Sequence, residues 1–345
     1  MDSFAGKLAV VTGGGSGMGR ELTRQLAGQG CSVAACDLNA DTLAETVTLA
    51  RAGAPPGVQV TAHACDVSDE AQVLRFRDEV LAEHASGHVD LVFSNAGIGG
   101  GESFTSGPRE VWERTFAIDW WGVYYCARAF LPLLTASRDG VLINTSSVNG
   151  FWASLGPRAP QTAYSTAKFA VRGFTEALIE DLRVNAPHVR VVLVLPGHVG
   201  TNIIVNSLRA RGLPPPEQMT DAELEELIPA RARARLIKAG ALAETASADD
   251  LRQLIIRGNA DFRDKAPVSA AKAATIILDG VRAGSWRVLI GEDAHTIDAA
   301  VRAKPESAYD YADLFGTEDK PFRPFRRLPA EAARRRSAHR PGVGR

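Results

Sequence analysis

The stretch from residue 7 to residue 27 restricts the fold of this chain more than any other part of it. Residues 7–11 form a short apolar run with β-branched side chains, which is typical of a buried parallel strand. A loop with five glycines follows from Thr12 to Gly19, and a helical pattern then runs from Arg20 to about Ala27. A strand that leads through a tight turn into a helix begins a β–α–β unit, so the sequence predicts an α/β fold.

The glycine loop also predicts a dinucleotide site. Glycines permit the tight turn and let backbone N–H groups approach a pyrophosphate, which then sits at the positive end of the following helix. The residues expected to contact the cofactor here are Gly13, Gly15, Ser16, Gly17, Met18 and Gly19.

The second predicted strand ends at Asp37, about 20 residues beyond the loop. A carboxylate at this place accepts hydrogen bonds from an adenosine ribose and repels a 2′-phosphate. Neither Leu38, which follows it and should also contact the cofactor, nor Ser16 in the loop offers a cation to a 2′-phosphate. We therefore expect NAD rather than NADP. Asp37 could also cap the helix that begins near Asn39.

Tyr164 and Lys168 suggest acid/base chemistry at an alcohol or carbonyl oxygen. A spacing of four residues puts both side chains on one face of a helix, one turn apart. A nearby ammonium favours the phenolate and lowers the phenol pKa toward the working range, so the pair suits proton exchange with an alcohol or carbonyl oxygen.

Six motifs in this order resemble the short-chain dehydrogenase/reductase family, in its subfamily of single-domain enzymes. The resemblance runs from about Gly6 to Asp298. The motifs are Thr12-Gly13 through Gly17-Met18-Gly19, Asp66-Val67, Asn95-Ala96-Gly97, Ser146-Ser147, Tyr164 to Lys168, and Pro196-Gly197-His198-Val199-Gly200-Thr201.

The resemblance implies a role for each matched residue. Ser147 would donate a hydrogen bond to the substrate oxygen, Tyr164 would be the acid/base, and Lys168 would hold the nicotinamide ribose. Asp66 would contact the adenine amino group. The remaining cofactor contacts would come from Val67, Asn95, Ala96, Gly97, Pro196, Gly197, Val199 and Thr201.

Two places depart from the family pattern. Asp119 stands where the family usually has an Asn that bends a helix and holds a water leading to the lysine; we expect it to keep this relay role, with a surface carboxylate as the alternative. The stretch after Ser147 is longer than usual. Its Phe151 and Trp152 could line a hydrophobic substrate site or cover the core. His198 could reach the reacting centre or form a pocket wall.

Alternating strand and helix patterns predict a doubly wound, parallel, seven-stranded Rossmann sheet in the order 3-2-1-4-5-6-7 with helices on both faces. Residues 1–305 form one domain, in which 202–266 are an inserted substrate lid, and 306–345 form a basic, mobile extension. The seven strands are expected at 7–12, 31–36, 58–65, 89–94, 140–146, 189–195 and 286–290.

Composition narrows the class of protein. The net charge of −1 over 345 residues argues against nucleic-acid binding. The sequence has no run of 18 apolar residues and no expected secretory signal, so no membrane partner is predicted. Cys31, Cys36, Cys65 and Cys126 form no CxxC pair and fit the core of a protein in the reducing cytoplasm. No metal is indicated.

These observations predict an NAD-dependent oxidoreductase that moves a hydride between nicotinamide and a secondary alcohol or ketone. Trp120, Trp121, Phe151 and Trp152 make a hydrophobic or alicyclic substrate plausible. The alternatives are an NADPH-dependent 3-oxoacyl carrier-protein reductase and a non-catalytic NAD-sensing protein. The resemblance also implies a homodimer or homotetramer built on helices near 108–134 and 162–184.

Overall fold

A parallel sheet of seven strands forms the centre of the molecule in the computed structural model, which describes residues 1–100, 103–154 and 161–315. Its order is β3-β2-β1-β4-β5-β6-β9, and every neighbouring pair is parallel. This confirms the predicted topology; the seventh strand is β9 because a two-stranded sheet, β7–β8, precedes it in the chain. The strands are β1 Leu8–Thr12, β2 Ser32–Asp37, β3 Val60–Ala64, β4 Leu91–Ser94, β5 Val141–Thr145, β6 Arg190–Pro196 and β9 Arg287–Ile290, with β7 Val199–Gly200 and β8 Val268–Ser269 in the small sheet.

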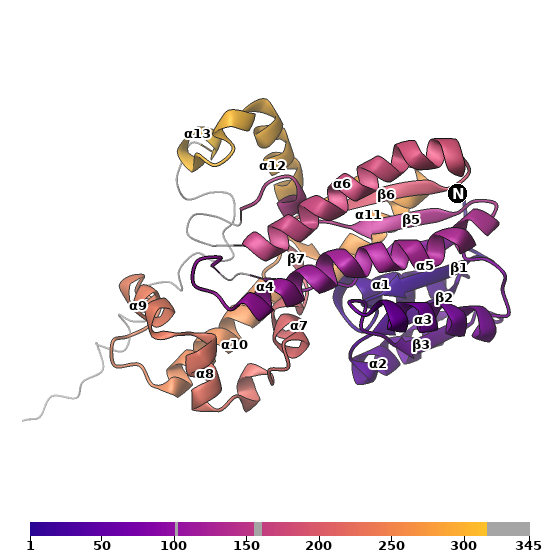
Figure 1. Ribbon diagram of the computed structural model, residues 1–345. Coiled ribbons are helices and arrows are strands. Elements are labelled where there is room, and N and C mark those ends of the chain that lie inside the picture. The colour runs from indigo at the N-terminus through magenta and orange to yellow at the C-terminus, as the bar shows by residue number, and fades with distance from the viewer. Residues whose placement is uncertain (101–102, 155–160, 316–345) are drawn as a thin grey trace, which may run out of the picture.

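Helices cover both faces of this sheet (Figure 1). One face packs against α1 (Gly17–Gly28), α2 (Ala40–Gly53) and α11 (Ala270–Arg282). The other packs against α3 (Glu70–Glu83), α5 (Gly122–Ala136) and α6 (Thr162–Asn185). No helix within the described ranges has both the length and the apolar character that a membrane crossing requires.

The central strand β1 shows why these segments form a two-sided core. All five of its side chains are buried. Ala9 and Val11 point into the cluster with α1 and α11, whereas Leu8 and Val10 point into the cluster with α3 and α5. Because alternate side chains of a strand face opposite sides of a sheet, a strand covered on both faces carries apolar residues toward both. The buried hydroxyl of Thr12, at the end of β1, donates a hydrogen bond to the Phe93 carbonyl.

A π-helical turn interrupts the long helix that the sequence analysis expected near 108–134. The chain passes from α4 (Arg109–Phe116) through η1 (Ala117–Trp121) into α5. Single π turns inside α-helices are frequently found at functional sites. This turn contains Asp119, whose side chain is fully buried.

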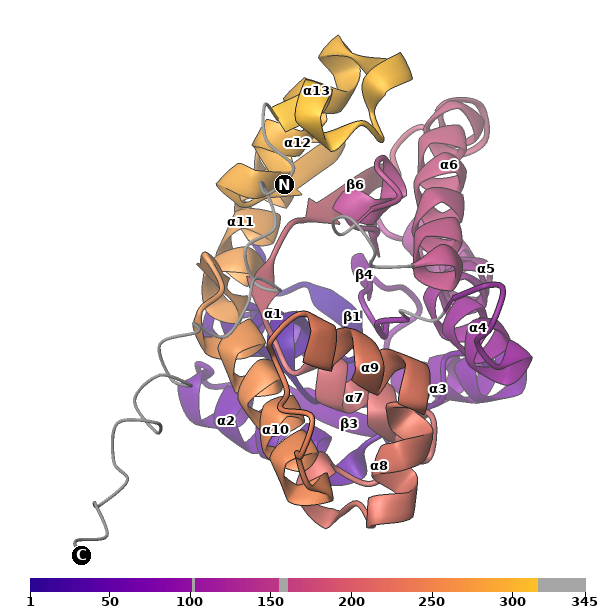
Figure 2. The same cartoon turned by 90° about the vertical axis from the view of Figure 1, so that its left-hand side faces the viewer.

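The predicted lid region forms a separate helical group that begins after β6. Figure 2 shows α7, α8, α9 and α10 gathered together in the lower part of the view, with α12 and α13 at the top. Thr220 and Glu223 form a capping box at the start of α8, and Ser247 and Asp250 form a second one at the start of α10. The helices are α7 Ile203–Ala210, α8 Asp221–Leu227, α9 Ala230–Lys238, α10 Ala248–Asp264, α12 Glu292–Ala303 and α13 Tyr311–Phe315, with short 3₁₀ turns η2 Val148–Gly150, η3 Pro216–Gln218 and η4 Pro305–Ser307.

Helical structure continues past residue 305, the predicted start of the extension. Ala308 is buried, and α13 packs beside α12 through the cluster that contains Trp152. The indole Nε1 of Trp152 donates a hydrogen bond of 2.6 Å to the Ala308 carbonyl oxygen. Residues 316–345 of the expected extension lie outside the described residues.

Candidate functional site

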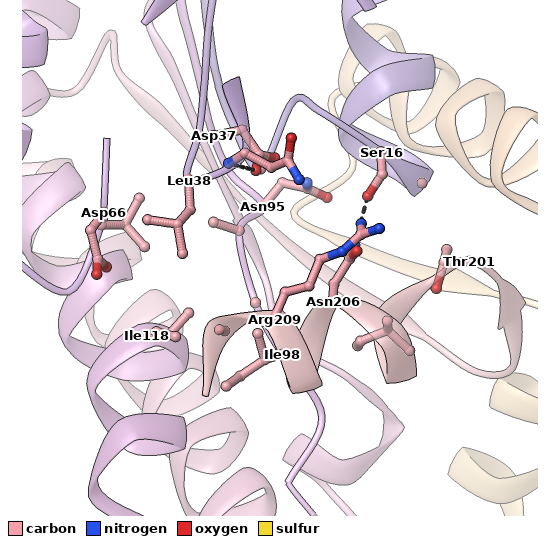
Figure 3. A pocket seen from close by; sticks show the side chains of 18 of the residues that line it. Ser16, Asp37, Leu38, Asp66, Asn95, Ile98, Ile118, Thr201, Asn206 and Arg209 are labelled. Carbon is pink, nitrogen blue, oxygen red and sulfur yellow. Dashed lines mark hydrogen bonds between the residues drawn. The ribbon is translucent and has the colours of Figure 1, made fainter. Parts of the chain in front are cut away.

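A pocket of about 400 Å³ lies at the carboxyl ends of β1, β2 and β4, where an open parallel sheet of this order has its ligand crevice. Most of the residues predicted to hold a cofactor line it (Figure 3). The predicted residues in its wall are Gly13, Ser16, Gly17, Met18, Asp37, Leu38, Asp66, Val67, Asn95, Ala96, Gly97 and Thr201.

The glycine loop has the geometry that a pyrophosphate needs. Gly13 has a φ of +67°, and a Cβ there would lie 2.8 Å from the Cα of Ala96. A Cβ at Gly19 would collide with the Gly13 carbonyl. Among the described residues, the N-cap residue Ser16 makes no side-chain hydrogen bond to the first turn of α1. The N–H groups of this turn, at the positive helix end, therefore fit a bound diphosphate.

Asp37 fixes the loop rather than capping a helix. One of its carboxylate oxygens accepts a hydrogen bond of 2.8 Å from the Gly15 N–H, and the other accepts one of 2.9 Å from the Asn39 N–H. Asn39 is itself the N-cap of α2, with its side chain accepting from the Thr42 N–H. A carboxylate can accept further bonds, so Asp37 still suits a ribose.

Asp66 forms an ion pair with an arginine that no sequence motif marks. Arg114 of α4 donates to one Asp66 oxygen at 2.7 Å, and Ser68 donates to the other. Burial raises the pKa of Asp66, but the hydrogen bonds from Ser68 and Arg114 outweigh it and hold the pKa below its usual range. Asp66 is therefore an ionised carboxylate, already paired with Arg114, where it faces the pocket.

The end of β4 is tied to the end of β1 by the Thr12 hydroxyl, which accepts from the N–H groups of Asn95 and Ala96 at 3.0 Å. The amide nitrogen of Asn95 donates to the Thr12 carbonyl, also at 3.0 Å. These bonds hold Asn95, Ala96 and Gly97 along the floor of the pocket.

The segment after β6 reaches the pocket wall at Thr201, whereas the other predicted cofactor contacts of this segment, Pro196, Gly197 and Val199, are not among the residues that line the pocket. Thr201 lies against Gly17, where a Cβ would be 3.1 Å from its methyl carbon. Pro196 ends β6, and Val199 is buried in β7. Gly197 lies so close to Asp293 that any side chain would collide with its carboxylate.

Ser147, Tyr164 and Lys168 lie together beside this pocket. Ser147 is 6% exposed at the start of η2, and its hydroxyl hydrogen-bonds Tyr164. Lys168 is 3% exposed, its ammonium lies 5.5 Å from the centre of the Tyr164 ring, and it donates to the Thr145 carbonyl at 3.2 Å. A Cβ at Gly97, in the pocket wall, would lie 3.2 Å from the Lys168 nitrogen. The three side chains thus adjoin the dinucleotide pocket.

The pKa of Tyr164 differs from the expectation. Burial raises it above the ordinary phenol value, the Asp119 carboxylate raises it further, and the hydrogen bond with Ser147 only partly opposes this. Burial is the largest of these effects, so the lowering of this pKa that was expected from the neighbouring Lys168 is not found.

Asp119 faces inward, so the alternative that it is a carboxylate on the helix surface is wrong. It is 0% exposed, and one of its oxygens accepts a hydrogen bond of 2.8 Å from the Ile98 N–H. Within the described residues the other oxygen has no hydrogen-bond partner. Burial raises the pKa of Asp119 to about 6, although the Lys168 ammonium and the bond from Ile98 both lower it. The carboxylate is thus placed to act on Lys168 electrostatically.

The aromatic residues and the histidine that were predicted for the substrate site lie elsewhere. Trp152 is fully buried and Phe151 is 8% exposed, both in the core cluster with α12, because the bend after η2 turns these rings inward. The His198 ring lies 2.8 Å from the Phe262 carbonyl of α10, and its backbone N–H donates to Asp293. Trp120 and Trp121 pack with Tyr124 and Phe174 outside the pocket. The described structure does not bring these aromatic residues to the site.

The pocket wall also contains residues that the sequence analysis missed. Arg114 comes from α4. Asn206 and Arg209, both labelled in Figure 3, come from α7. Nothing in the local sequence marks a helix of the lid region as part of a cofactor wall, since its position depends on packing between distant segments.

A sequence profile of the short chain dehydrogenase family matches residues 7–211, more than half of the chain. The chain is 36% identical over 302 residues to the Mycobacterium tuberculosis protein named "Putative oxidoreductase SadH", covering 88% of this chain and 92% of that protein. It therefore belongs to the short-chain dehydrogenase/reductase family and is an oxidoreductase of that family.

Two solved structures extend the comparison. A short chain dehydrogenase/reductase from Burkholderia phymatum in complex with NAD has a TM-score of 0.67 at 28% identity, covering 93% of this chain and 99% of that chain. A metagenomic short-chain oxidoreductase in complex with NADP has a TM-score of 0.50 at 32% identity, covering 56% and 83%. A nicotinamide cofactor is therefore supported for the pocket, without a choice between NAD and NADP.

Asp119→Asn should change the pH dependence of stability. The folded-state pKa of about 6 lies above the ordinary value of 3.8, so the folded protein holds this proton more tightly than the unfolded chain. The free energy of unfolding should therefore fall as pH rises from about 4 through about 6, by up to about 3 kcal/mol, and the Asn variant should lack this loss. Urea unfolding between pH 4.5 and 7.5 measures the difference between the two proteins. A difference that stays constant across this range would contradict the assignment; the exposed Asp78→Asn serves as control.

Proposed function

We propose that this protein is an NAD-dependent oxidoreductase that interconverts a secondary alcohol and a ketone. The arrangement of Ser147, Tyr164 and Lys168 beside a pocket built for a dinucleotide carries the proposal. A phenol, a hydroxyl donor and an ammonium at one spot suit the transfer of a proton to or from a substrate oxygen.

Tyr164 is the proposed acid/base. When the alcohol is oxidised, its hydroxyl proton moves to the Tyr164 oxygen, and in the reverse direction Tyr164 returns it to the forming alkoxide. Ser147 donates a hydrogen bond to the same substrate oxygen, where negative charge develops. The nicotinamide, when bound, supplies the hydride acceptor or donor, and its oxidised ring is cationic.

Lys168 and Asp119 set the charge around this phenol. The Lys168 ammonium favours the phenolate and is placed to hold the nicotinamide ribose hydroxyls. Asp119 lies buried next to it and, above its pKa of about 6, offsets part of that positive charge. We propose that Asp119 keeps the relay role of the usual Asn as a positioning residue, through Lys168 rather than through substrate contact.

The bonds of Asp37 support NAD as the cofactor. Its carboxylate is fixed at the tip of β2 by Gly15 and Asn39, where it would repel a 2′-phosphate. For the substrate, the half-buried Ile204 adds an apolar side chain at the start of α7, next to the cofactor pocket, and supports a hydrophobic or alicyclic alcohol.

Tyr164→Phe should abolish turnover while leaving cofactor binding intact. The ring and its packing remain, but the proton has no acceptor, so kcat should fall about a thousandfold or more. An NAD(H) activity screen on hydrophobic alcohols and ketones, together with NADH binding by fluorescence, measures both quantities. Tyr124→Phe, which also removes only a hydroxyl, is the control. Equal loss of turnover and NADH binding would show that Tyr164 is misassigned.

Asp37→Ser should move the cofactor preference toward NADP. Removing the carboxylate removes its repulsion of the 2′-phosphate, so the ratio of kcat/KM for NADP to that for NAD should rise at least tenfold. Initial rates with each cofactor give this ratio. Wild-type protein that already favours NADP tenfold would refute the assignment of NAD.

We also propose that the chain forms a homo-oligomer through the outer surface of α5 and α6, which lie side by side in both views (Figures 1 and 2). Trp121 is 41% exposed on this surface and Phe169 is 40% exposed. Trp121 stacks on Tyr125 at 5.8 Å between ring centres. Large aromatic side chains are enriched in interfaces between subunits.

Trp121→Arg should therefore shift the protein to a smaller species, because a buried interface cannot easily hold an unpaired guanidinium. Size-exclusion chromatography with light scattering at micromolar concentration measures the mass. A monomeric wild-type protein, or an unchanged oligomer in the variant, would show that this surface is not the interface.

A further inference from the structure

Three hydrogen bonds hold α7 of the lid region across the cofactor pocket. The Asn206 amide donates to the Ser16 hydroxyl at 2.8 Å, which ties the helix to the glycine loop. The Ser207 hydroxyl accepts from the Gly99 N–H at 2.8 Å, beyond the end of β4. Arg114 donates to the Ala210 carbonyl at 3.2 Å while pairing with Asp66. The helix is thus bonded to three different parts of the pocket rim.

The position of α7 places the guanidinium of Arg209 in the pocket wall. Arg209 follows Asn206 by three residues, so the two side chains lie on neighbouring turns of the same helix face. Figure 3 shows both pointing from α7 toward Ser16. Arg209 lines the pocket, and within the described part of the chain no ion pair or hydrogen bond is found for its guanidinium.

The charges around the pocket leave Arg209 available for a bound anion. Arg114 is paired with Asp66 at 2.7 Å. Arg20, beside the glycine loop, donates to the Gly15 carbonyl at 2.9 Å and pairs with Glu45 at 2.6 Å. Asp37 adds a negative charge that a diphosphate at the loop has to tolerate. The Arg209 guanidinium near Ser16 would offset the negative charge of Asp37 and that of the diphosphate.

We propose that Arg209 binds the pyrophosphate of the dinucleotide, so that the cofactor itself holds α7 closed over the pocket. The proposal rests on the proposed function and goes beyond it by assigning a lid residue to the cofactor. The alternative phosphate source is a 2′-phosphate, but the Asn206–Ser16 bond places the helix at the N-terminus of α1, and Asp37 occupies the ribose side.

The test compares Arg209→Gln with Arg257→Gln, which removes an exposed arginine from α10 of the same lid region and outside the pocket wall. Purified proteins are titrated with NADH, with ADP-ribose, which carries the pyrophosphate but no nicotinamide, and with NADPH. Loss of a charge-assisted bond to phosphate should weaken NADH and ADP-ribose binding alike, by about ten- to a hundredfold. Arg257→Gln should bind all three as wild type does, and the NADH-to-NADPH affinity ratio of Arg209→Gln should stay unchanged.

Hydrogen exchange gives a second measurement that does not depend on activity. NADH should slow amide exchange across residues 203–210 in wild type and much less in Arg209→Gln. Unchanged NADH and ADP-ribose affinity in Arg209→Gln, or a loss confined to NADPH, would overturn the pyrophosphate assignment. Wild-type protein that binds no NADH would overturn the proposed function itself, so the two failures are distinguishable.

Discussion

The backbone of the glycine loop lies directly against the end of β4, and the rest of the site is built outward from that contact. A Cβ at Gly13 would meet the Cα of Ala96 at 2.8 Å, so no other residue permits this approach. The Thr12 hydroxyl holds the two strand ends together from the same place. Because the loop is this close to the sheet, the start of α1, the tip of β2 and the end of β4 open onto one pocket.

Charge inside this site is arranged in opposing pairs. Asp66 is matched by Arg114, and the fully buried Asp119 is opposed by Lys168. Buried charges are tolerated only when they have partners, and removal of one partner leaves the other exposed to the full cost of burial. The pKa of Tyr164 shows the result: burial raises it, the Asp119 carboxylate raises it further, and the hydrogen bond with Ser147 opposes them only in part. The π-helical turn at Ala117–Trp121 is the local feature that brings Asp119 inward to this arrangement.

The sequence predicted the cofactor wall more successfully than the substrate region. The glycine loop, Asp37, Asp66, Asn95 and Thr201 all follow strand ends or motifs with fixed local spacing, and all line the pocket. Trp152 and His198 follow equivalent strand ends, yet one lies in the core with α12 and the other contacts α10. Their directions depend on segments more than 60 residues away in the chain.

The sequence by itself determined the strands, the glycine loop and the Tyr164–Lys168 pair, because periodicity, glycine geometry and helical spacing act over a few residues. The strand order then followed from the right-handed crossovers between parallel strands. Only the tertiary structure decided which distant side chains complete the walls. Arg114 reaches Asp66 across 48 residues, and Asn206 reaches Ser16 across 190. Such contacts arise from the packing of whole helices, which no local pattern encodes, and they decide which charges remain available inside the pocket.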